Sequence, residues 1–190
     1  MNASTAMSAQ TADPTQKTIV LIGLMGAGKS SVGRVLAGKL GLPFVDSDDE
    51  VEKAAGCSIE DIFEVYGEPA FRDVEERVIQ RLLEAPAKVV SSGGGAYMNE
   101  RTRQRIARSA VSVWLRADLN VLEKRTRRRT AGRPLLKDVD PRAKLEQLMK
   151  ERYPVYERAD IIIDSIDETP DKTADKIIEQ LSLERPPAGT

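Results

Sequence analysis

Residues 23–30 read Gly-Leu-Met-Gly-Ala-Gly-Lys-Ser, and no other stretch limits the possible folds of this chain so strongly. They match G-x-x-x-x-G-K-[ST], the P-loop pattern in which backbone N–H groups surround nucleotide phosphates. The β-branched, apolar residues 18–22 precede the loop. Apolar residues with helical spacing follow it, at Val32, Val35, Leu36 and Leu40. Strand, loop and helix therefore come in the order that a P-loop requires, which favours this interpretation over an ordinary glycine-rich turn.

The fixed positions of the loop each have a physical reason. Glycines let the backbone N–H groups turn inward because they carry no Cβ, and the N-terminus of the next helix adds partial positive charge. Lys29 can reach the β- and γ-phosphates, and Ser30 can place its hydroxyl on Mg²⁺. We expect the nucleotide to contact six consecutive residues, Gly26, Ala27, Gly28, Lys29, Ser30 and Ser31.

Composition restricts the class of protein further. A chain of 190 residues suits one α/β domain, and its net charge of −1 gives no general attraction to nucleic acid or acidic membranes. Its one cysteine, Cys57, cannot form an internal disulfide and suits a reducing cytosol. We therefore expect a cytoplasmic monomer without nucleic-acid or membrane partners. We also expect a disordered N-terminal tail at 1–16, a single domain at 17–184, and a loose tail at 185–190.

The absence of histidine from the sequence narrows the chemistry. Serine–histidine and cysteine–histidine catalysis, and zinc bound by histidine, are excluded. Any proton transfer must use Asp, Glu, Lys, Tyr or water.

Apolar runs predict five strands, at 19–22, 44–45, 89–91, 111–115 and 161–163. Helical patterns lie between them: 48–55 ended by Gly56, a segment from a Ser58–Asp61 capping box to Gly67, and another opening at Phe71. Two further helices begin at Asp140-Pro141 and Thr169-Pro170. This alternation predicts a parallel sheet with helices on both faces, and ligands at the carboxyl ends of its strands.

Three motifs directly follow predicted strands and should meet at one edge of the sheet: the P-loop, Asp46-Ser47-Asp48 and Gly93-Gly94-Gly95. One of the two aspartates can support Mg²⁺ through water, and the other can accept a hydrogen bond from a substrate hydroxyl. The alternative for an aspartate here is capping of the next helix. Three glycines permit close approach of a ligand to the backbone, although a tight turn is also consistent with them.

Arginines supply the remaining candidates. Arg72 has the fork of donors that binds a carboxylate, although an arginine in this position is more often solvated. An arginine-dense segment between Leu122 and Leu136 has three interpretations: a lid over the phosphates, a nucleic-acid patch, or a solvated helix face. Arg133 is its strongest functional candidate, because it stands between Gly132 and Pro134 in a predicted loop.

These motifs together resemble the shikimate kinase family, in order and over residues 17–183. The resemblance rests on the P-loop, Phe44-x-Asp46-x-Asp48, Ile62-Phe63-x-x-x-Gly67-Glu68-x-x-Phe71-Arg72-x-x-Glu75, Gly93-Gly94-Gly95, Arg133-Pro134-Leu135-Leu136 and Arg152-x-x-x-Tyr156. It implies a P-loop NTPase three-layer α/β sandwich of the nucleoside monophosphate kinase type. The expected sheet has five parallel strands in the order 2-3-1-4-5, with substrate-binding helices at about 48–83 and a lid at about 126–140.

The resemblance also implies the reaction: transfer of the γ-phosphoryl group of ATP to the 3-hydroxyl of shikimate, on the route to chorismate and aromatic amino acids. It implies that Lys29, Asp48 and Arg133 are catalytic, and that Ser30 and Asp46 serve Mg²⁺. Shikimate would contact Asp48, Arg72, Gly93, Gly94, Gly95, Arg133 and Arg152. The adenine would lie between Pro170 and an arginine, either Arg125 or Arg127, with Arg133 also on the nucleotide. The alternatives are a gluconate-type or other small-molecule kinase, a nucleotide-binding regulator without catalysis, and a nucleic-acid-binding module.

Overall fold

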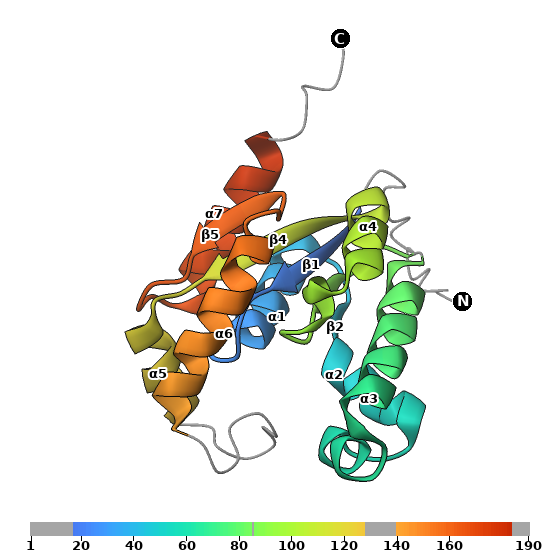
Figure 1. Cartoon of the computed structure of the whole chain (residues 1–190). Helices are drawn as coiled ribbons and strands as arrows, with labels where there is room; N and C mark the ends of the chain where they lie inside the picture. Colours follow the sequence, from blue (N-terminus) through green and yellow to red (C-terminus); the bar gives the residue numbers. More distant parts are fainter. Residues whose placement is uncertain (1–16, 85, 128–139, 184–190) are drawn as a thin grey trace, which may run out of the picture.

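Five parallel strands form the centre of the fold in the order β2-β3-β1-β4-β5. Figure 1 shows this sheet with helices packed around it. The structure is a computed structural model that describes residues 17–84, 86–127 and 140–183. The strands are β1 (Thr18–Ile22), β2 (Phe44–Asp46), β3 (Val89–Ser91), β4 (Ala110–Arg116) and β5 (Ile161–Asp164). The predicted architecture and strand order are therefore confirmed, and each predicted strand differs from the observed one by at most one residue at either end.

Strand β1 lies in the middle of the sheet and is buried along its whole length. Leu21 pairs with Ser91 of β3 on one side and with Val113 of β4 on the other. A strand buried on both faces must be continuously apolar, which explains the unbroken run before the P-loop.

Helices cover both faces of the sheet. They are α1 (Lys29–Leu40), α2 (Ser47–Ala55), α3 (Ile59–Leu83), α4 (Glu100–Ser109), α5 (Leu119–Arg127), α6 (Pro141–Tyr156) and α7 (Pro170–Leu183), with a 3₁₀ turn η1 (Ala96–Met98). Helices α1 and α7 contact each other on one face, while α3, α4 and α6 lie on the other (Figure 1). This arrangement follows from right-handed crossovers between parallel strands.

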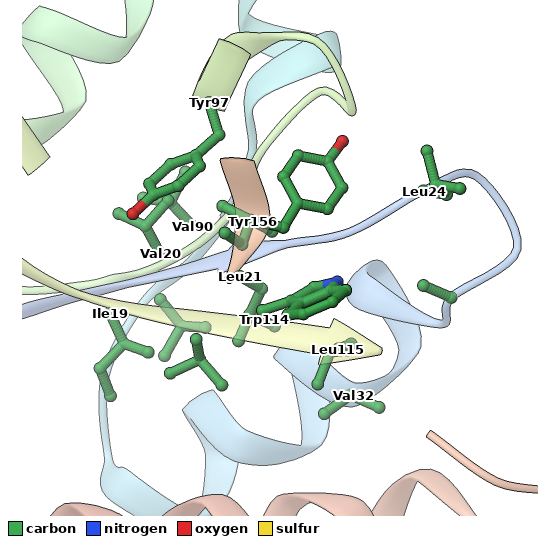
Figure 2. Packing of buried hydrophobic residues seen from close by; sticks show 14 of the residues in the cluster. Ile19, Val20, Leu21, Leu24, Val32, Val90, Tyr97, Trp114, Leu115 and Tyr156 are labelled. Atoms are coloured by element: carbon green, nitrogen blue, oxygen red, sulfur yellow. The ribbon is translucent and has the colours of Figure 1, made fainter. Parts of the chain in front are cut away.

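The core between these layers contains an aromatic group next to the P-loop strand. Trp114 lies 5.8 Å from Tyr156 and 4.8 Å from Tyr153, measured between ring centroids, in edge-to-face arrangements. Figure 2 shows Trp114, Tyr97 and Tyr156 with the buried aliphatic residues of β1. Since Tyr153 and Tyr156 belong to α6, this group fixes α6 against the sheet.

The predicted helix ends are largely confirmed by their caps. Gly56 ends α2 in the left-handed region, Ser58 and Asp61 form both hydrogen bonds of a capping box, and the Asp140 side chain accepts from the backbone N–H of Arg142. Gly67 interrupts α3 with φ 79° and ψ 171°, as the predicted break requires. The helix resumes directly after Gly67, so the predicted start at Phe71 lies several residues too far toward the C-terminus.

Helix α4 was absent from the sequence prediction, and a helix at α5 was only one of three interpretations of the arginine-dense segment. In α4 only Thr102 and Ile106 are buried, so a helical period could not be recognised. The start of the arginine-dense segment is helix α5, with Leu122 and Thr126 buried. Within the described ranges, no helix is both long and apolar enough to cross a membrane. The predicted tails at 1–16 and 185–190 and most of the predicted lid, including Arg133, lie outside the described residues.

Candidate active site

A cleft of about 510 Å³ opens where the carboxyl ends of β1, β2 and β3 meet. It brings together almost all of the described candidate residues. Its lining includes Gly26, Ala27, Gly28, Lys29, Ser30, Ser31, Asp46, Asp48, Arg72, Gly93, Gly94, Gly95, Arg125, Arg152 and Pro170. The position of the cleft matches the rule for open α/β sheets, in which ligands bind outside the carboxyl ends of the strands.

The P-loop has the geometry needed to hold phosphates. Gly26 and Gly28 adopt φ values of 83° and 97°, which side chains with a Cβ rarely tolerate. Helix α1 begins at Lys29, so its N-terminus points its partial positive charge into the cleft. The Lys29 ammonium donates to the carbonyl oxygens of Gly23 and Leu24, at 2.9 and 3.1 Å. Lys29 is thereby held over the loop that a nucleotide would occupy.

Ser30 and Asp46 form a pair across the floor of the cleft. The Ser30 hydroxyl donates to Asp46 Oδ2 at 2.7 Å and lies 3.3 Å from the Ser91 hydroxyl. The other oxygen of Asp46 accepts from the backbone N–H of Asp48, so Asp46 caps α2 and the Asp48 side chain remains available to the cleft. Among the described residues no group of three or more metal-ligating side chains occurs. The Ser30 hydroxyl and the Asp46 carboxylate supply oxygen ligands of the kind that Mg²⁺ prefers, with further positions open to phosphates and water.

Asp48 is an unusual carboxyl group. Burial raises its pKa from 3.8 to about 6, and the charge of Asp46 adds to this, whereas Lys29 acts in the opposite direction. A carboxylate with a pKa close to the working pH suits a general base or a strong hydrogen-bond acceptor. Asp48 therefore has the properties needed to orient and deprotonate a hydroxyl.

Arg72 is held by two glutamates of its own helix. Its Nη1 donates to Glu75 Oε2 at 2.7 Å, and its Nε and Nη2 both donate to Glu68 Oε1, at 3.2 and 2.8 Å. Glu75 is 3% exposed, and burial raises its pKa although Arg72 opposes this shift. Arg72 is thus a positioned group of the cleft and not a solvated surface residue.

Each of the three consecutive glycines lies against a charged side chain. A Cβ on Gly93 would be 2.5 Å from Glu75 Oε1, and a Cβ on Gly94 would be 3.1 Å from Arg152 Nη1. A Cβ on Gly95 would overlap the Arg72 guanidinium. The glycines therefore allow two guanidinium groups and two carboxylates, those of Glu75 and Asp48, to approach the backbone, which a tight turn alone would not require.

Arg152 completes this part of the cleft from α6. Arg152 is 9% exposed and lies one helical turn before Tyr156. The Tyr156 hydroxyl donates to the carbonyl oxygen of Gly94. Burial raises the pKa of Tyr156, so its hydroxyl stays protonated and remains a donor. The α6 helix and the glycine segment are connected by this bond, which fixes Arg152 relative to Arg72.

The structure separates the two arginines that the sequence could not distinguish. Arg125 lines the cleft, and its guanidinium donates to the Ser165 hydroxyl at 3.0 Å and to the Ile166 carbonyl oxygen at 2.8 Å. Arg127 does not line the cleft; its side chain is 74% exposed and pairs with Glu123. Pro170 lines the same end of the cleft as Arg125.

Two residues of the site had no role in the sequence prediction, although both occur in the quoted motifs. Glu75 anchors Arg72, and Tyr156 anchors the glycine segment. The spacing of Arg72 and Glu75 places them on one helix face, which could have indicated the ion pair. Nothing local could have shown that Tyr156 reaches a carbonyl 62 residues away.

Comparison with known proteins identifies the family of the chain. The family model described as "Shikimate kinase" matches residues 25–182. The chain belongs to the shikimate kinase family. A shikimate kinase of Paramagnetospirillum magneticum is 56% identical over 165 residues, which cover 87% of this chain and 84% of the relative. A solved shikimate kinase from Acinetobacter baumannii, in complex with shikimate, has a TM-score of 0.86 at 37% identity, covering 90% of this chain and 97% of that one.

Kinases with lower sequence identity share the fold. A gluconokinase from Sinorhizobium meliloti has a TM-score of 0.51 at 20% identity, covering 90% of this chain and 98% of that one. At that identity the likeness shows the fold alone. The comparisons therefore favour a shikimate kinase over the gluconate-type alternative.

Proposed function

We propose that this chain transfers the γ-phosphoryl group of ATP to the 3-hydroxyl of shikimate, giving shikimate 3-phosphate and ADP, in the biosynthesis of chorismate and aromatic amino acids. The observation that carries the proposal is one cleft lined by P-loop residues 25–30, by the half-buried Asp48, and by Arg72 and Arg152 placed against Gly95 and Gly94. Membership of the shikimate kinase family supports the same activity.

The donor half of the cleft binds the nucleotide. The backbone of residues 26–31 cradles the phosphates, Lys29 neutralises the transferring group, and Arg125 with Pro170 holds the adenine. Ser30 and Asp46 fit a Mg²⁺ site because their hydroxyl and carboxylate already face each other at 2.7 Å. When bound, the ion would neutralise charge on the phosphates. Arg133 is proposed to act on the transferring phosphoryl group, as the resemblance implies.

The acceptor half binds a hydroxylated acid. Arg72 and Arg152 are suited to the shikimate carboxylate, and Asp48 is suited to hold the attacking hydroxyl in line with the phosphorus. Gly93, Gly94 and Gly95 bring backbone groups close to the ring. Phosphoryl transfer through a loose transition state depends on positioning and charge neutralisation, so the absence of histidine is no obstacle.

The test is ADP release with ATP and Mg²⁺ in the presence of shikimate, of gluconate, or of no acceptor. We expect turnover with shikimate and only background with the other two. ADP release that is faster with gluconate than with shikimate, or that is the same with and without an acceptor, would contradict the proposal. Mass measurement of shikimate 3-phosphate identifies the product.

The remaining organisation is part of the same proposal. We infer a single kinase domain at 17–184 in which α2 and α3 form the shikimate-binding part, with a lid at about 126–140. We also infer a cytoplasmic monomer that acts on small molecules and has no nucleic-acid or membrane partner. A near-neutral net charge of −1 supports the last point.

A further inference from the structure

Both donor edges of the Arg72 guanidinium already carry a carboxylate. Glu68 Oε1 accepts from Nε and Nη2, which form one edge, and Glu75 accepts from Nη1, which belongs to the other. A substrate carboxylate that binds Arg72 through two parallel N–H groups needs one complete edge. One of the two glutamates must therefore leave.

Exposure decides which glutamate can move. The Glu75 side chain is 4% exposed, so moving it would leave a carboxylate buried without its partner. The Glu68 side chain is 55% exposed and can be solvated by water once released. Ion pairs with this exposure are weak, so a bidentate ligand can replace Glu68 at small cost.

The space around Arg72 agrees with this exchange. A second cavity of about 450 Å³ lies beside the cleft, and Arg72, Gly95 and Arg152 line both cavities. Glu68 lines only the second. A carboxylate held jointly by Arg72 and Arg152 stands at this boundary, and Glu68 has room to withdraw from it.

Charge balance points in the same direction. In the free protein, Arg72 pairs with Glu68 and Glu75, and the positive charge of Arg152 also acts on Glu75. A substrate carboxylate adds a third negative charge, and release of Glu68 to water restores the balance.

We propose that Glu68 is an internal competitor of the substrate carboxylate: it occupies Arg72 in the free enzyme and is displaced when shikimate binds. This inference rests on the function proposed above. Its consequence is selectivity, because an acceptor without a carboxylate cannot replace Glu68 and gains nothing from Arg72. Glu68 also shields Arg72 from simple anions.

The experiment compares the wild type with Glu68→Gln by calorimetric titration of shikimate and by steady-state kinetics. We expect Glu68→Gln to lower the Kd and KM for shikimate about two- to fivefold, the range of an exposed ion pair. The KM for ATP should not change. The KM for methyl shikimate, which lacks the negative charge, should also be the same in both proteins.

Glu100→Gln is the matched control. Glu100 lines the same second cavity, and its carboxylate accepts from Gln104 and not from Arg72. The Glu100→Gln substitution removes the same charge as Glu68→Gln. If both variants lower the Kd for shikimate equally, the cause is a general electrostatic effect and the proposal is overturned. Glu68→Ala gives the same comparison if the glutamine variant is unstable.

An unchanged or raised Kd for shikimate in Glu68→Gln would also overturn the proposal that Glu68 competes with the substrate. A raised Kd would mean that Glu68 instead positions Arg72 for shikimate binding. These results differ from failure of the proposed function, which would appear as no shikimate-dependent ADP release by the wild type.

Discussion

Asp48 and Glu75 present carboxylate oxygens to the same glycine. A Cβ on Gly93 would lie 2.9 Å from Asp48 Oδ1 and 2.5 Å from Glu75 Oε1, so no side chain separates the two acids. Glu75 contributes to the raised pKa of Asp48, and Glu75 is in turn paired with Arg72. Asp48, the proposed acceptor of the substrate hydroxyl, is therefore electrostatically coupled through Glu75 to Arg72, the proposed partner of the substrate carboxylate.

The raised pKa of Asp48 predicts an acid limb in the pH profile. Because only the ionised carboxylate can accept the hydroxyl proton, kcat/KM for shikimate should fall as the pH drops through about 6. The measurement is the coupled ADP assay between about pH 5 and pH 8 under saturating ATP. A flat profile through this range would show that ionisation of Asp48 is not required.

Replacing Asp48 should separate stability from activity. Its folded-state pKa of about 6 lies above the ordinary 3.8, so the ionised form destabilises the fold above pH 6 and the penalty disappears as the pH falls toward 3.8. Asp48→Asn should therefore raise the free energy of unfolding at pH 7 by about 1–3 kcal/mol and reduce turnover at least about 100-fold. ATP binding should survive. The measurements are denaturant unfolding, ADP release and nucleotide titration.

The control for that substitution is Asp49→Asn, which removes an exposed carboxylate at the next position. It should change neither stability nor turnover appreciably. Loss of ATP binding in folded Asp48→Asn would contradict the role assigned to Asp48.

Arg72→Lys tests the carboxylate contact more cleanly than Arg72→Ala. Alanine would leave Glu75 buried without its ion-pair partner, which costs about 3–5 kcal/mol. Lysine keeps the charge beside Glu75 but lacks the planar fork, so the KM for shikimate should rise about tenfold or more with a smaller change in kcat. Arg81→Lys, on the same helix and paired with Glu50 at the surface, is the control. An unaltered shikimate KM in Arg72→Lys would count against the contact.

Arg125 and Arg127 should differ in their effect on ATP. Arg125 lines the cleft beside Pro170, whereas Arg127 pairs with Glu123 at the surface. Arg125→Ala should raise the KM for ATP by about three- to thirtyfold, which is the value of a stacked guanidinium, and Arg127→Ala should change it less than about twofold. Steady-state kinetics with varied ATP measures both. An equal change in the KM for ATP in both variants would contradict the assignment of Arg125, and not Arg127, to the nucleotide.

Two glycines at the end of α1 should respond to alanine in opposite directions. Gly38 is helical, and a Cβ there meets nothing within 4 Å, so Gly38→Ala should stabilise the protein by about 0.5–1 kcal/mol. Gly41 ends the helix at φ 66°, so Gly41→Ala should destabilise it by about 1 kcal/mol. Thermal unfolding at matched pH compares them. The same sign of shift for both variants would refute the conformational explanation.

Local patterns predicted a large part of this molecule. The apolar run of β1, the capping box at Ser58 and the break at Gly67 depend only on neighbouring residues, so they could be recognised from the sequence. Helix α4 could not be recognised from the sequence, because it buries too few apolar residues to show a helical hydrophobic period. The P-loop, Asp48 and the three glycines were expected at one sheet edge because parallel strands bring their carboxyl ends together.

The sequence by itself determined that a P-loop protein of the shikimate kinase family would have a nucleotide site beside candidates for an acceptor site. Only the tertiary structure decided which arginine lines the cleft, which carboxylates hold Arg72, and why residues 93–95 lack side chains. Local motifs arise from the conformational preferences of adjacent residues. The long-range contacts of the site depend on how α3, α5 and α6 pack against the sheet. This packing brings Arg72 to Gly95, Arg125 to Ser165 and Tyr156 to Gly94.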